Sequence, residues 1–416
     1  MEQKIVKTAV PEGGMGWSAI GGEEIEAVTA LLLEPRNLFR VRPDGQPSEC
    51  EQLEREICTK TGAAHSLFVA SGTGALSCCL TGFEVGPGDE VIIPAYTFIA
   101  TAAAVVDVGA VPVIAEIDES LGMDPDDLEK KITAHTKAVI VVHMVGVPAR
   151  LAAIRDICKK HGLVLIEDCC QAIGATYNGK FCGLESDAFA WSTNFFKVIT
   201  CGEGGVFATN NAHAFQRGIY QSDNGLNSIG QGHPADSSIE AFSRSGIRGN
   251  EIAAAILRVQ LSKMDAMLSH TRTLKKLFFK QLNKPPKHYK PQHIDDPEGD
   301  CGFCINLIVN DKSKVSPILD MAKAEGLPLA PALEKGDLHN YSNWTPILKK
   351  RSATQAGYPW KDPTYKGNTQ YSPNMCPKSS NILSRTLRLL LNINTQEPNI
   401  KEFAQAINKI DERLKD

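Results

Sequence analysis

One lysine, Lys197, lies in an apolar stretch between two strand-like runs of the chain, with Trp191, Phe195 and Phe196 close to it in sequence. An ammonium group in apolar surroundings is poorly solvated, so we expect a lowered pKa and an accessible neutral amine. A neutral lysine amine can form a Schiff base with an aldehyde. The simpler alternative is a surface lysine whose stem lies along a loop. Other residues must decide between these two interpretations.

A glycine-rich turn follows the strand-like run that ends at Val69, and Gly72 and Thr73 lie where the next helix should begin. Small residues at this position leave backbone N–H groups exposed at the positive end of the helix dipole, which favours an anion such as phosphate. An ordinary glycine-rich helix cap is the alternative. After the next strand-like run comes Phe98, whose ring can either lie flat on a ring-shaped ligand or pack in the core.

The apolar run at residues 163–166 ends in acidic residues, and a carboxylate in this position is costly unless it has a partner. Asp168 is suited to hold a protonated ring nitrogen. Gln171, three residues further on, falls on the same side if a helix begins here, and its amide can donate to a ring oxygen. Asp168 would serve equally well as a helix N-cap.

Taken together, these residues match the needs of pyridoxal 5'-phosphate (PLP). Its phosphate requires a helix N-terminus, its pyridinium a carboxylate, and its aldehyde a lysine. Asp168 precedes Lys197 by 29 residues. Each residue alone is ambiguous, but their order along the chain favours a PLP site.

The elements that position these residues alternate regularly between strand and helix. Strand-like runs lie at residues 66–69, 90–93, 111–115, 138–143 and 163–167. Helix-like stretches lie between them at residues 74–82, 100–108, 125–132 and 149–161. This alternation predicts the α/β class, with a mostly parallel sheet covered on both faces and ligands at the carboxyl ends of its strands.

A long helical pattern over residues 250–282 precedes two strand-like runs, at residues 303–309 and 386–392, and two helical stretches, at residues 317–326 and 399–413. We expect the lobe boundary near residue 265. The chain would then consist of a large domain, residues 1–265, and a small C-terminal α+β domain, residues 266–416.

Composition narrows the class of protein. The 416 residues carry a net charge of −4, which argues against nucleic acid or a membrane surface as the main partner. No apolar run is long enough to span a membrane, and the first residues lack a signal-peptide core. The 12 cysteines are scattered, which indicates reduced thiols and a cytoplasmic location. A single CxxC pair at residues 301–304 has no second pair, so we expect no metal site.

The chain resembles the DegT/DnrJ/EryC1/StrS family of sugar aminotransferases, which are fold type I PLP enzymes, over nearly its whole length. The motifs that carry the resemblance lie at residues 71–76, 94–98, 167–172 and 192–205. The resemblance implies a three-layer α/β/α large domain and a homodimer with sites at the interface. It also implies a role for each site residue: Lys197 for the Schiff base, Asp168 for the ring nitrogen, Gln171 for the ring hydroxyl, Phe98 for stacking, and Gly72, Thr73 and Ser192 for the phosphate.

Within the family, residues 295–300, 338–344 and 377–385 are most similar to the members that aminate an 8-keto octulosonate sugar with glutamate. The chain departs from the family where an Asn usually stands two residues before an arginine and reaches the partner's phosphate. Arg248 matches the arginine, but the Asn position is Gly246. Asn250 is the candidate replacement.

The resemblance predicts a ping-pong exchange in which glutamate or glutamine donates the amino group and a keto sugar accepts it. A donor carboxylate needs a cation, for which Arg248, Arg385 and Arg40 are candidates, and His143 and His339 are candidate ligand contacts. The Gly246 departure and the bulky run at residues 193–196 leave another PLP reaction open, such as decarboxylation, cyclisation or elimination on an amino acid. A non-catalytic regulator with the same fold would need a nucleic-acid-binding segment, and none is visible in the sequence.

Overall fold

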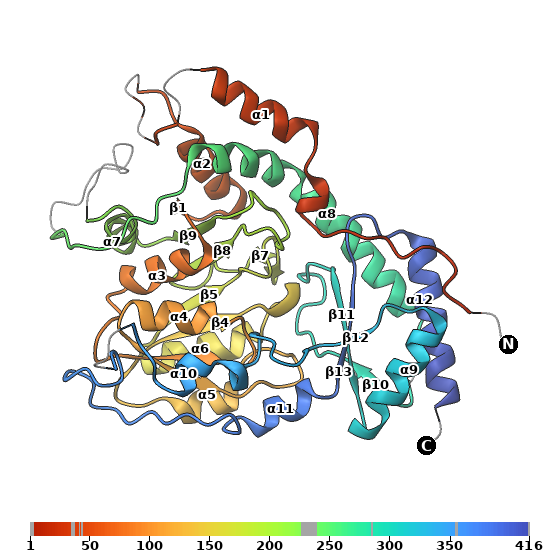
Figure 1. The fold of residues 1–416 in the computed structure, drawn as a ribbon. Helices are drawn as coiled ribbons and strands as arrows, with labels where there is room; N and C mark the ends of the chain where they lie inside the picture. Colours follow the sequence, from red (N-terminus) through yellow and green to blue (C-terminus); the bar gives the residue numbers. More distant parts are fainter. Residues whose placement is uncertain are drawn as a thin grey trace.

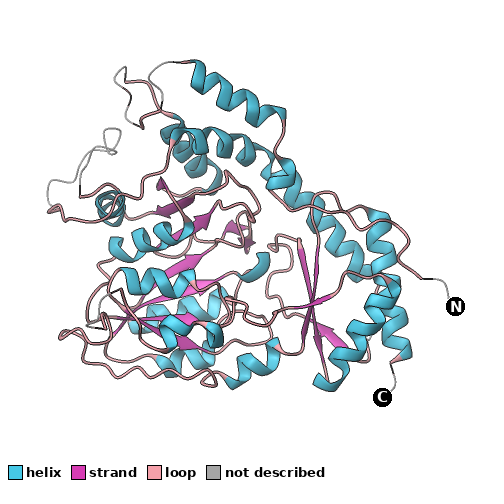
Figure 2. Cartoon of the chain, in the orientation of Figure 1, coloured by secondary structure: helices cyan, strands magenta, loops and turns pink. Residues whose placement is uncertain are grey.

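The computed structural model describes residues 4–34, 38–40, 42, 45–225, 239–283, 286–353 and 357–414. A large sheet with helices on both faces forms one part of the molecule, and a smaller sheet with helices on its outer side forms the other (Figure 1). The long helix α8 (Glu251–Gln281) runs from the first part into the second. Figure 2 shows how the strands of the two sheets are wrapped by helices.

The large sheet has the strand order β1-β9-β8-β5-β4-β2-β3. Its strands are β1 (His65–Val69), β2 (Glu90–Pro94), β3 (Val111–Ala115), β4 (Thr136–Val142), β5 (Val164–Asp168), β8 (Ala188–Ser192) and β9 (Gly205–Thr209). The neighbours from β8 to β3 pair in parallel, whereas β9 runs antiparallel to both β1 and β8. The predicted strands and their mostly parallel pairing are confirmed.

Alternate side chains of these strands enter different apolar clusters, because successive residues of a strand point to opposite faces. On one face, Leu67, Ile93 and Ile166 pack with α3 (Gly72–Gly82), α4 (Ala100–Asp107) and α7 (Ala212–Ser222). On the other face, the cluster includes Phe68, Ile92 and Leu165. The helices that supply this second cluster are α2 (Glu49–Thr61), α5 (Pro125–Lys131), α6 (Leu151–His161) and α8. The predicted three-layer arrangement follows from this alternation.

Local sequence signals set the helix boundaries. Ser48 Oγ caps α2 by accepting a hydrogen bond from the Glu51 amide, and the Glu51 carboxylate accepts one from the Ser48 amide, which is a capping box. The same helix ends at Gly62, whose φ of 86° is left-handed and suits glycine. The observed bounds of the helices predicted from the sequence differ from the predicted ones by at most two residues.

The smaller sheet is antiparallel and has the order β10-β11-β13-β12. Its strands are β10 (Tyr289–Pro291), β11 (Cys304–Val309), β12 (Ala330–Pro331) and β13 (Thr386–Leu390). Helices α9 (Val315–Glu325) and α12 (Glu397–Arg413) and the second half of α8 share one apolar cluster with this sheet. The predicted lobe boundary at residue 265 falls inside α8 and stays a prediction.

A long segment joins β12 to β13. It contains the short helix α10 (Thr345–Leu348) and leads into α11 (Pro377–Leu383). A small hairpin, β6 (Thr176–Tyr177) and β7 (Lys180–Phe181), and the N-terminal helix α1 (Gly22–Leu33) complete the elements. Among the helices of the described residues, none is long and apolar enough to cross a membrane.

Candidate functional site

The carboxyl ends of several strands meet at one edge of the large sheet, and the predicted site residues follow them. Ser192 and Asp168 are the last residues of β8 and β5, and Phe98 lies four residues beyond the end of β2. Since β9 is antiparallel to both of its neighbours, β1 runs in the same direction as β8. Gly72, at the start of α3, therefore reaches the same edge.

The Asp168 carboxylate is only 4% exposed and is held by two donors. Oδ2 accepts a hydrogen bond from the Thr101 hydroxyl at 2.9 Å, and Oδ1 accepts one from the Cys170 amide at 3.0 Å. A buried carboxylate is costly unless its oxygens have partners. With two bonds in place, the carboxylate is fixed in orientation and keeps lone pairs for a cationic ligand.

A cup at the start of α3 faces the end of β8. A Cβ atom on Gly72 would lie 2.6 Å from Ser192 Cβ and 3.0 Å from Cys170 Sγ, so no larger residue fits without displacing them. Ser71 caps the helix, because its Oγ accepts the Gly74 amide at 3.1 Å. The N–H groups of the first turn and the Ser192 hydroxyl therefore lie next to each other, as an anion requires.

Lys197 lies in the loop between β8 and β9 and is half-buried. Its amide donates to the Asn194 carbonyl at 3.0 Å, and its own carbonyl accepts the Gly16 amide at 3.1 Å. The side chains of Phe195 and Phe196 are 43% and 80% exposed, so they do not enclose the lysine as the sequence suggested. Within the described residues, the Lys197 amine forms no ion pair.

The Cys170 thiol is influenced by both the Lys197 amine and the Asp168 carboxylate. Burial raises the pKa of its thiol well above the usual value, the Asp168 charge raises it further, and the Lys197 charge lowers it. The charges of Asp168 and Lys197 therefore both act on the Cys170 thiol. The thiol stays protonated, so Cys170 packs the floor of the site and supplies no thiolate.

Phe98 and Gln171 flank the same edge. The Phe98 side chain is 42% exposed, and its ring lies 5.2 Å from the His339 ring, tilted by 48°. His339 comes from the segment between β12 and β13, and its Nδ1 pairs with Asp337 at 2.7 Å. The side-chain oxygen of Gln171, Oε1, accepts a hydrogen bond from the Val145 amide at 3.4 Å. The side-chain NH2 group is therefore left to donate to a ligand.

His143, a predicted ligand contact, has both ring nitrogens engaged within the chain. It is fully buried, its Nδ1 accepts the Ala149 amide at 3.0 Å, and its Nε2 lies 2.8 Å from Glu167 Oε2. With Nδ1 as acceptor, the proton sits on Nε2 and is donated to Glu167. Both ring nitrogens are thus used inside the core, where the pair braces the ends of β4 and β5.

The predicted arginines are also engaged elsewhere. Arg40 is 5% exposed and forms a bidentate pair with Glu54 at 2.5 and 2.6 Å. Arg248 pairs with the buried Asp223 at 2.6 Å. Arg385 donates to the Val309 carbonyl at 2.6 Å, on the small sheet. These contacts give each of the three side chains a structural role.

Asn250 serves as the N-cap of α8, since its Oδ1 accepts the Ala253 amide at 2.9 Å. This contact gives the Asn250 side chain a capping role that needs no cofactor. The space next to Gly246 is taken by another amide, because a Cβ there would lie 3.2 Å from Asn224 Oδ1. Sequence reasoning missed Asn224, which is distant from Gly246 in the chain.

Two further polar groups escaped the sequence analysis. The hydroxyls of Thr97 and Thr101 lie 2.8 Å apart, both are 1% exposed, and Thr101 continues to Asp168. The four-residue spacing of Thr97 and Thr101 could have predicted this contact, since residues so spaced share one face where a helix begins. Arg388, on β13, donates to the Tyr96 hydroxyl, and no local pattern announces that contact.

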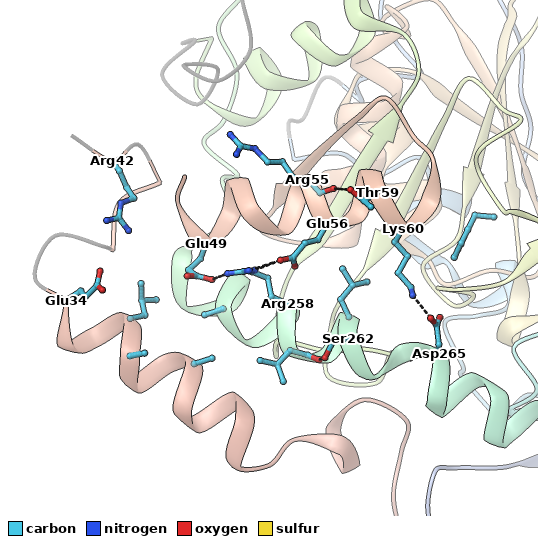
Figure 3. Close-up of a pocket in the computed structure, with 17 residues that line it drawn as sticks. Glu34, Arg42, Glu49, Arg55, Glu56, Thr59, Lys60, Arg258, Ser262 and Asp265 are labelled. Atoms are coloured by element: carbon cyan, nitrogen blue, oxygen red, sulfur yellow. Dashed lines mark hydrogen bonds and ion pairs between the residues drawn. The ribbon is translucent and has the colours of Figure 1, made fainter. Parts of the chain in front are cut away.

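A large hollow of the described residues lies elsewhere. It has a volume of about 1180 Å³ between α1, α2 and α8, and Lys197 and Asp168 are not among the residues that line it (Figure 3). Arg258 lies in it between Glu49 and Glu56, with both ion pairs at 2.7 Å. We call it the helical groove.

The strand-end residues fit the cofactor that the sequence predicts. A cup that excludes a Cβ at Gly72 faces Ser192, and an oriented carboxylate lies at Asp168. The Lys197 amine has no ion pair with any residue that the structure describes. These are an anion site, a partner for a cationic ring nitrogen and a nucleophile.

Comparison with known proteins gives a consistent result. Residues 43–330 match the DegT/DnrJ/EryC1/StrS aminotransferase family. The chain is 38% identical over 255 residues to the L-glutamine:2-deoxy-scyllo-inosose aminotransferase of Streptoalloteichus tenebrarius, which covers 60% of each protein. It is 46% identical over 164 residues to the UDP-N-acetyl-3-dehydro-alpha-D-glucosamine 3-aminotransferase of Acidithiobacillus ferrooxidans, over 38% of this chain and 44% of that protein. The matched part thus spans about three fifths of the first of these relatives.

Solved structures share the fold. 3-Amino-5-hydroxybenzoic acid synthase superposes with a TM-score of 0.76 at 24% identity, over 97% of this chain and 99% of that one. DesV from S. venezuelae superposes with a TM-score of 0.74 at 25% identity, over 94% of this chain and 95% of that one. Similarity therefore extends over both sheets.

Proposed function

The chain belongs to the DegT/DnrJ/EryC1/StrS aminotransferase family, and from this premise we propose that it is a PLP-dependent aminotransferase. It moves an amino group from glutamine or glutamate to a keto sugar. The observation that carries the proposal is the strand-end arrangement of the Asp168 carboxylate, the Gly72–Ser192 cup and the half-buried Lys197 amine.

Each residue has a defined task in this proposal. PLP, when bound, supplies an aldehyde that takes up an amino group and a ring that accepts electrons. Gly72, Thr73 and Ser192 hold its phosphate, and Asp168 keeps its ring nitrogen protonated, while Gln171 donates to the ring oxygen. Phe98 covers the PLP ring. The ring of His339 packs beside that of Phe98, with 5.2 Å between the two ring centroids.

Lys197 Nζ is the base of the reaction. It takes the proton from the amine-bearing carbon of the donor, a transfer that a positioned base accelerates by about 10²–10⁴-fold. Within the described residues its amine has no ion pair, so no carboxylate there holds it away from the donor. The kinetics would be ping-pong, because the keto product of the donor leaves before the keto sugar enters and takes up the amino group.

The substrates follow from the relatives and from local sequence. Two of the relatives are named as L-glutamine-dependent aminotransferases, and others are named for a 3-dehydro sugar nucleotide and for perosamine synthesis. A keto sugar is therefore the proposed acceptor. The segments at residues 295–300, 338–344 and 377–385 support the narrower proposal of an 8-keto octulosonate, since the middle segment supplies His339 next to Phe98.

We further propose that the enzyme is a homodimer with its sites at the interface. Trp17 and Phe195 stack at 5.5 Å, and Phe196 packs edge-on to Phe195 at 5.2 Å, yet these rings are 38%, 43% and 80% exposed. A cluster of exposed aromatic rings next to Lys197 supports burial by a second copy. Analytical ultracentrifugation should give twice the chain mass of 45.1 kDa, whereas a single-chain mass at micromolar concentration would overturn the dimer.

The function is tested by following keto-acid release from glutamine and from glutamate with a panel of keto sugars. The expected result is release that depends on the acceptor, with parallel lines in double-reciprocal plots. Release of carbon dioxide or ammonia from an amino acid without an acceptor would instead support the other reaction types. A protein that binds PLP but consumes no amino acid would contradict the proposal.

A further inference from the structure

An extended segment near the start of the chain, residues 5–16, joins the two parts of the molecule, and we call it the strap. It contains neither helix nor strand, and in Figure 1 it runs from beside α12 to the start of α1. Val6 packs in the apolar cluster of the small sheet. Met15 packs in the cluster of the large sheet that also contains Val198 and Ile199, the two residues after Lys197. The strap therefore has one anchor in each part.

Side chains of α12 and of the turn after β13 hold the strap at its first anchor. Glu402 accepts hydrogen bonds from the amides of Lys7 and Thr8, both at 2.9 Å. Asn394 donates its side-chain amide to the Glu12 carbonyl at 3.0 Å. Terminal segments are poorly ordered unless they are tied down, and these bonds tie the strap to the small sheet and its last helix.

At its second anchor the strap lies against the main chain of the loop that carries Lys197. The Gly16 amide donates a hydrogen bond to the Lys197 carbonyl at 3.1 Å. A Cβ atom on Gly16 would lie 2.8 Å from the Thr200 amide nitrogen and 3.0 Å from the Ile199 carbonyl carbon. Both of these atoms belong to the backbone, so a larger residue at position 16 must push the strap and the loop apart.

The loop has little freedom on its other side. The Thr200 amide donates to Gln260 Oε1 at 3.4 Å, and Gln260 is fully buried in α8. The Thr200 hydroxyl donates to the Thr193 carbonyl at 3.0 Å, which closes the loop on itself. The loop is therefore held as one unit, and a displacement of Gly16 acts on the main chain of Lys197.

We propose that the strap positions Lys197 for catalysis, because it ties the main chain of the lysine to the small sheet and so lets the placement of that sheet set where the amine lies. The inference rests on the proposed function for the task of Lys197 as base. A reacting group must be held within about 0.5 Å of its productive place, and a misplacement of about 1 Å can cost about 100-fold in rate. Gly16 and Asn394 act through Lys197, so we assign both as positioning residues.

The test follows the donor half-reaction of the holoenzyme by cofactor absorbance, with glutamate or glutamine and no acceptor. Gly16→Ala should lower the maximal rate by about tenfold or more, with the donor concentration for half-saturation within about twofold of the wild type. Asn394→Ala unties the far end of the strap and should lower the same rate by about twofold to fivefold, the effect of one hydrogen bond. Asn283→Ala is the matched control, since it removes an exposed amide bond to Glu412 of α12 away from the strap, and it should change neither value.

A second measurement needs no reaction. Hydrogen exchange read by mass spectrometry reports the opening of the lysine loop, because the amides of Thr200 and Cys201 are hydrogen-bonded inside the protein. In the holoenzyme, the peptide that carries these amides should exchange about threefold or more faster in Asn394→Ala than in the wild type. In Asn283→Ala it should exchange at the wild-type rate.

The inference is overturned if Gly16→Ala and Asn394→Ala both keep the wild-type maximal rate, or if exchange in the loop peptide is unchanged in Asn394→Ala. A loss confined to the donor concentration for half-saturation would also overturn it, because that value reports donor binding and not the base. If Gly16→Ala does not fold, Asn394→Ala is read alone in both assays. Failure of the proposed function looks different: the wild type then reacts with neither amino acid, while hydrogen exchange still reports whether the strap holds the lysine loop.

Discussion

The strand-end site and the helical groove of Figure 3 differ in how their charges are satisfied. In the groove, Arg258 is held by Glu49 and Glu56, and Lys60 by Asp265 at 2.6 Å. At the strand ends, neither Lys197 nor Arg388 has a carboxylate partner among the described residues. The groove therefore holds Arg258 and Lys60 in ion pairs within the chain, whereas Lys197 and Arg388 have no such pair among the described residues.

This difference indicates which region does chemistry. An ion pair inside a groove is a stabilising contact of modest size, and it leaves no charge for a ligand. An amine or guanidinium without a partner is unfavourable in the folded chain alone, so it signals a bound group. Unpaired charge locates the site better here than the volume of the hollow does.

The largest expected effect is on Lys197. Replacement by alanine removes both the attachment point and the base, so turnover should fall by about a thousandfold or more. The matched control is Lys60→Ala in the helical groove, which removes a partly exposed pair and should cost less than about 1 kcal/mol of stability with turnover unchanged. Steady-state rates of the two variants, measured side by side, check this prediction. Comparable losses of turnover in Lys197→Ala and Lys60→Ala would contradict the claim that only the strand-end site does chemistry.

A smaller effect is expected at Thr101, which donates to Asp168 at 2.9 Å. Thr101→Val keeps the shape but removes a hydrogen bond to a charged group, so PLP should bind about tenfold more weakly. Thr59→Val is the counterpart in the groove, where the lost bond goes only to the Arg55 carbonyl at 2.8 Å. Fluorescence titration of both apoproteins with PLP gives the comparison. Unchanged PLP affinity in Thr101→Val would show that Asp168 needs no support from the hydroxyl.

The smallest effect concerns α1, a wall of the groove. Burial alone would raise the pKa of Glu24, but hydrogen bonds from Lys263, Gln260 and the Gly21 amide outweigh it and lower the pKa. A lowered folded-state pKa contributes stability above the unfolded value of about 4.3, and that contribution is lost as pH falls through the folded value. Glu24→Gln should therefore unfold a few degrees below the wild type at pH 7.

The gap in unfolding temperature should close as the pH falls below about 4. Thermal melts of the two proteins from pH 3 to pH 7 measure it, with turnover at pH 7 as the companion reading. A difference in unfolding temperature that widened as the pH fell would mean that the pKa of Glu24 is raised in the folded protein and not lowered. A loss of turnover larger than tenfold would make the groove part of the active site.

Local patterns in the sequence were sufficient for the sheet and for the order of the site residues. The alternation of apolar strands and helices predicted where Asp168 and Ser192 would lie, because parallel strands end at a common edge. Local patterns could not reveal which polar groups pair with each other. Arg248 meets Asp223 and Arg40 meets Glu54 through tertiary contacts, so sequence alone left them as candidates for a ligand.

The misses have the same cause. His143 follows a strand, which made it a candidate ligand contact, and its ring turns into the core toward Glu167. Arg388 comes from a strand nearly 300 residues beyond Tyr96, and only the packing of the small sheet against the loop after β2 joins them. Phe195 and Phe196 are apolar in the sequence yet exposed in the single chain.

The most direct test of the central claim is to reduce the purified protein with borohydride, digest it and locate the modified lysine by mass spectrometry. The account predicts a phosphopyridoxyl group on Lys197, in the peptide that follows Ser192, and its absence from Lys197→Ala. A protein that takes up no label in the presence of added PLP, or one labelled at a different lysine, would contradict it.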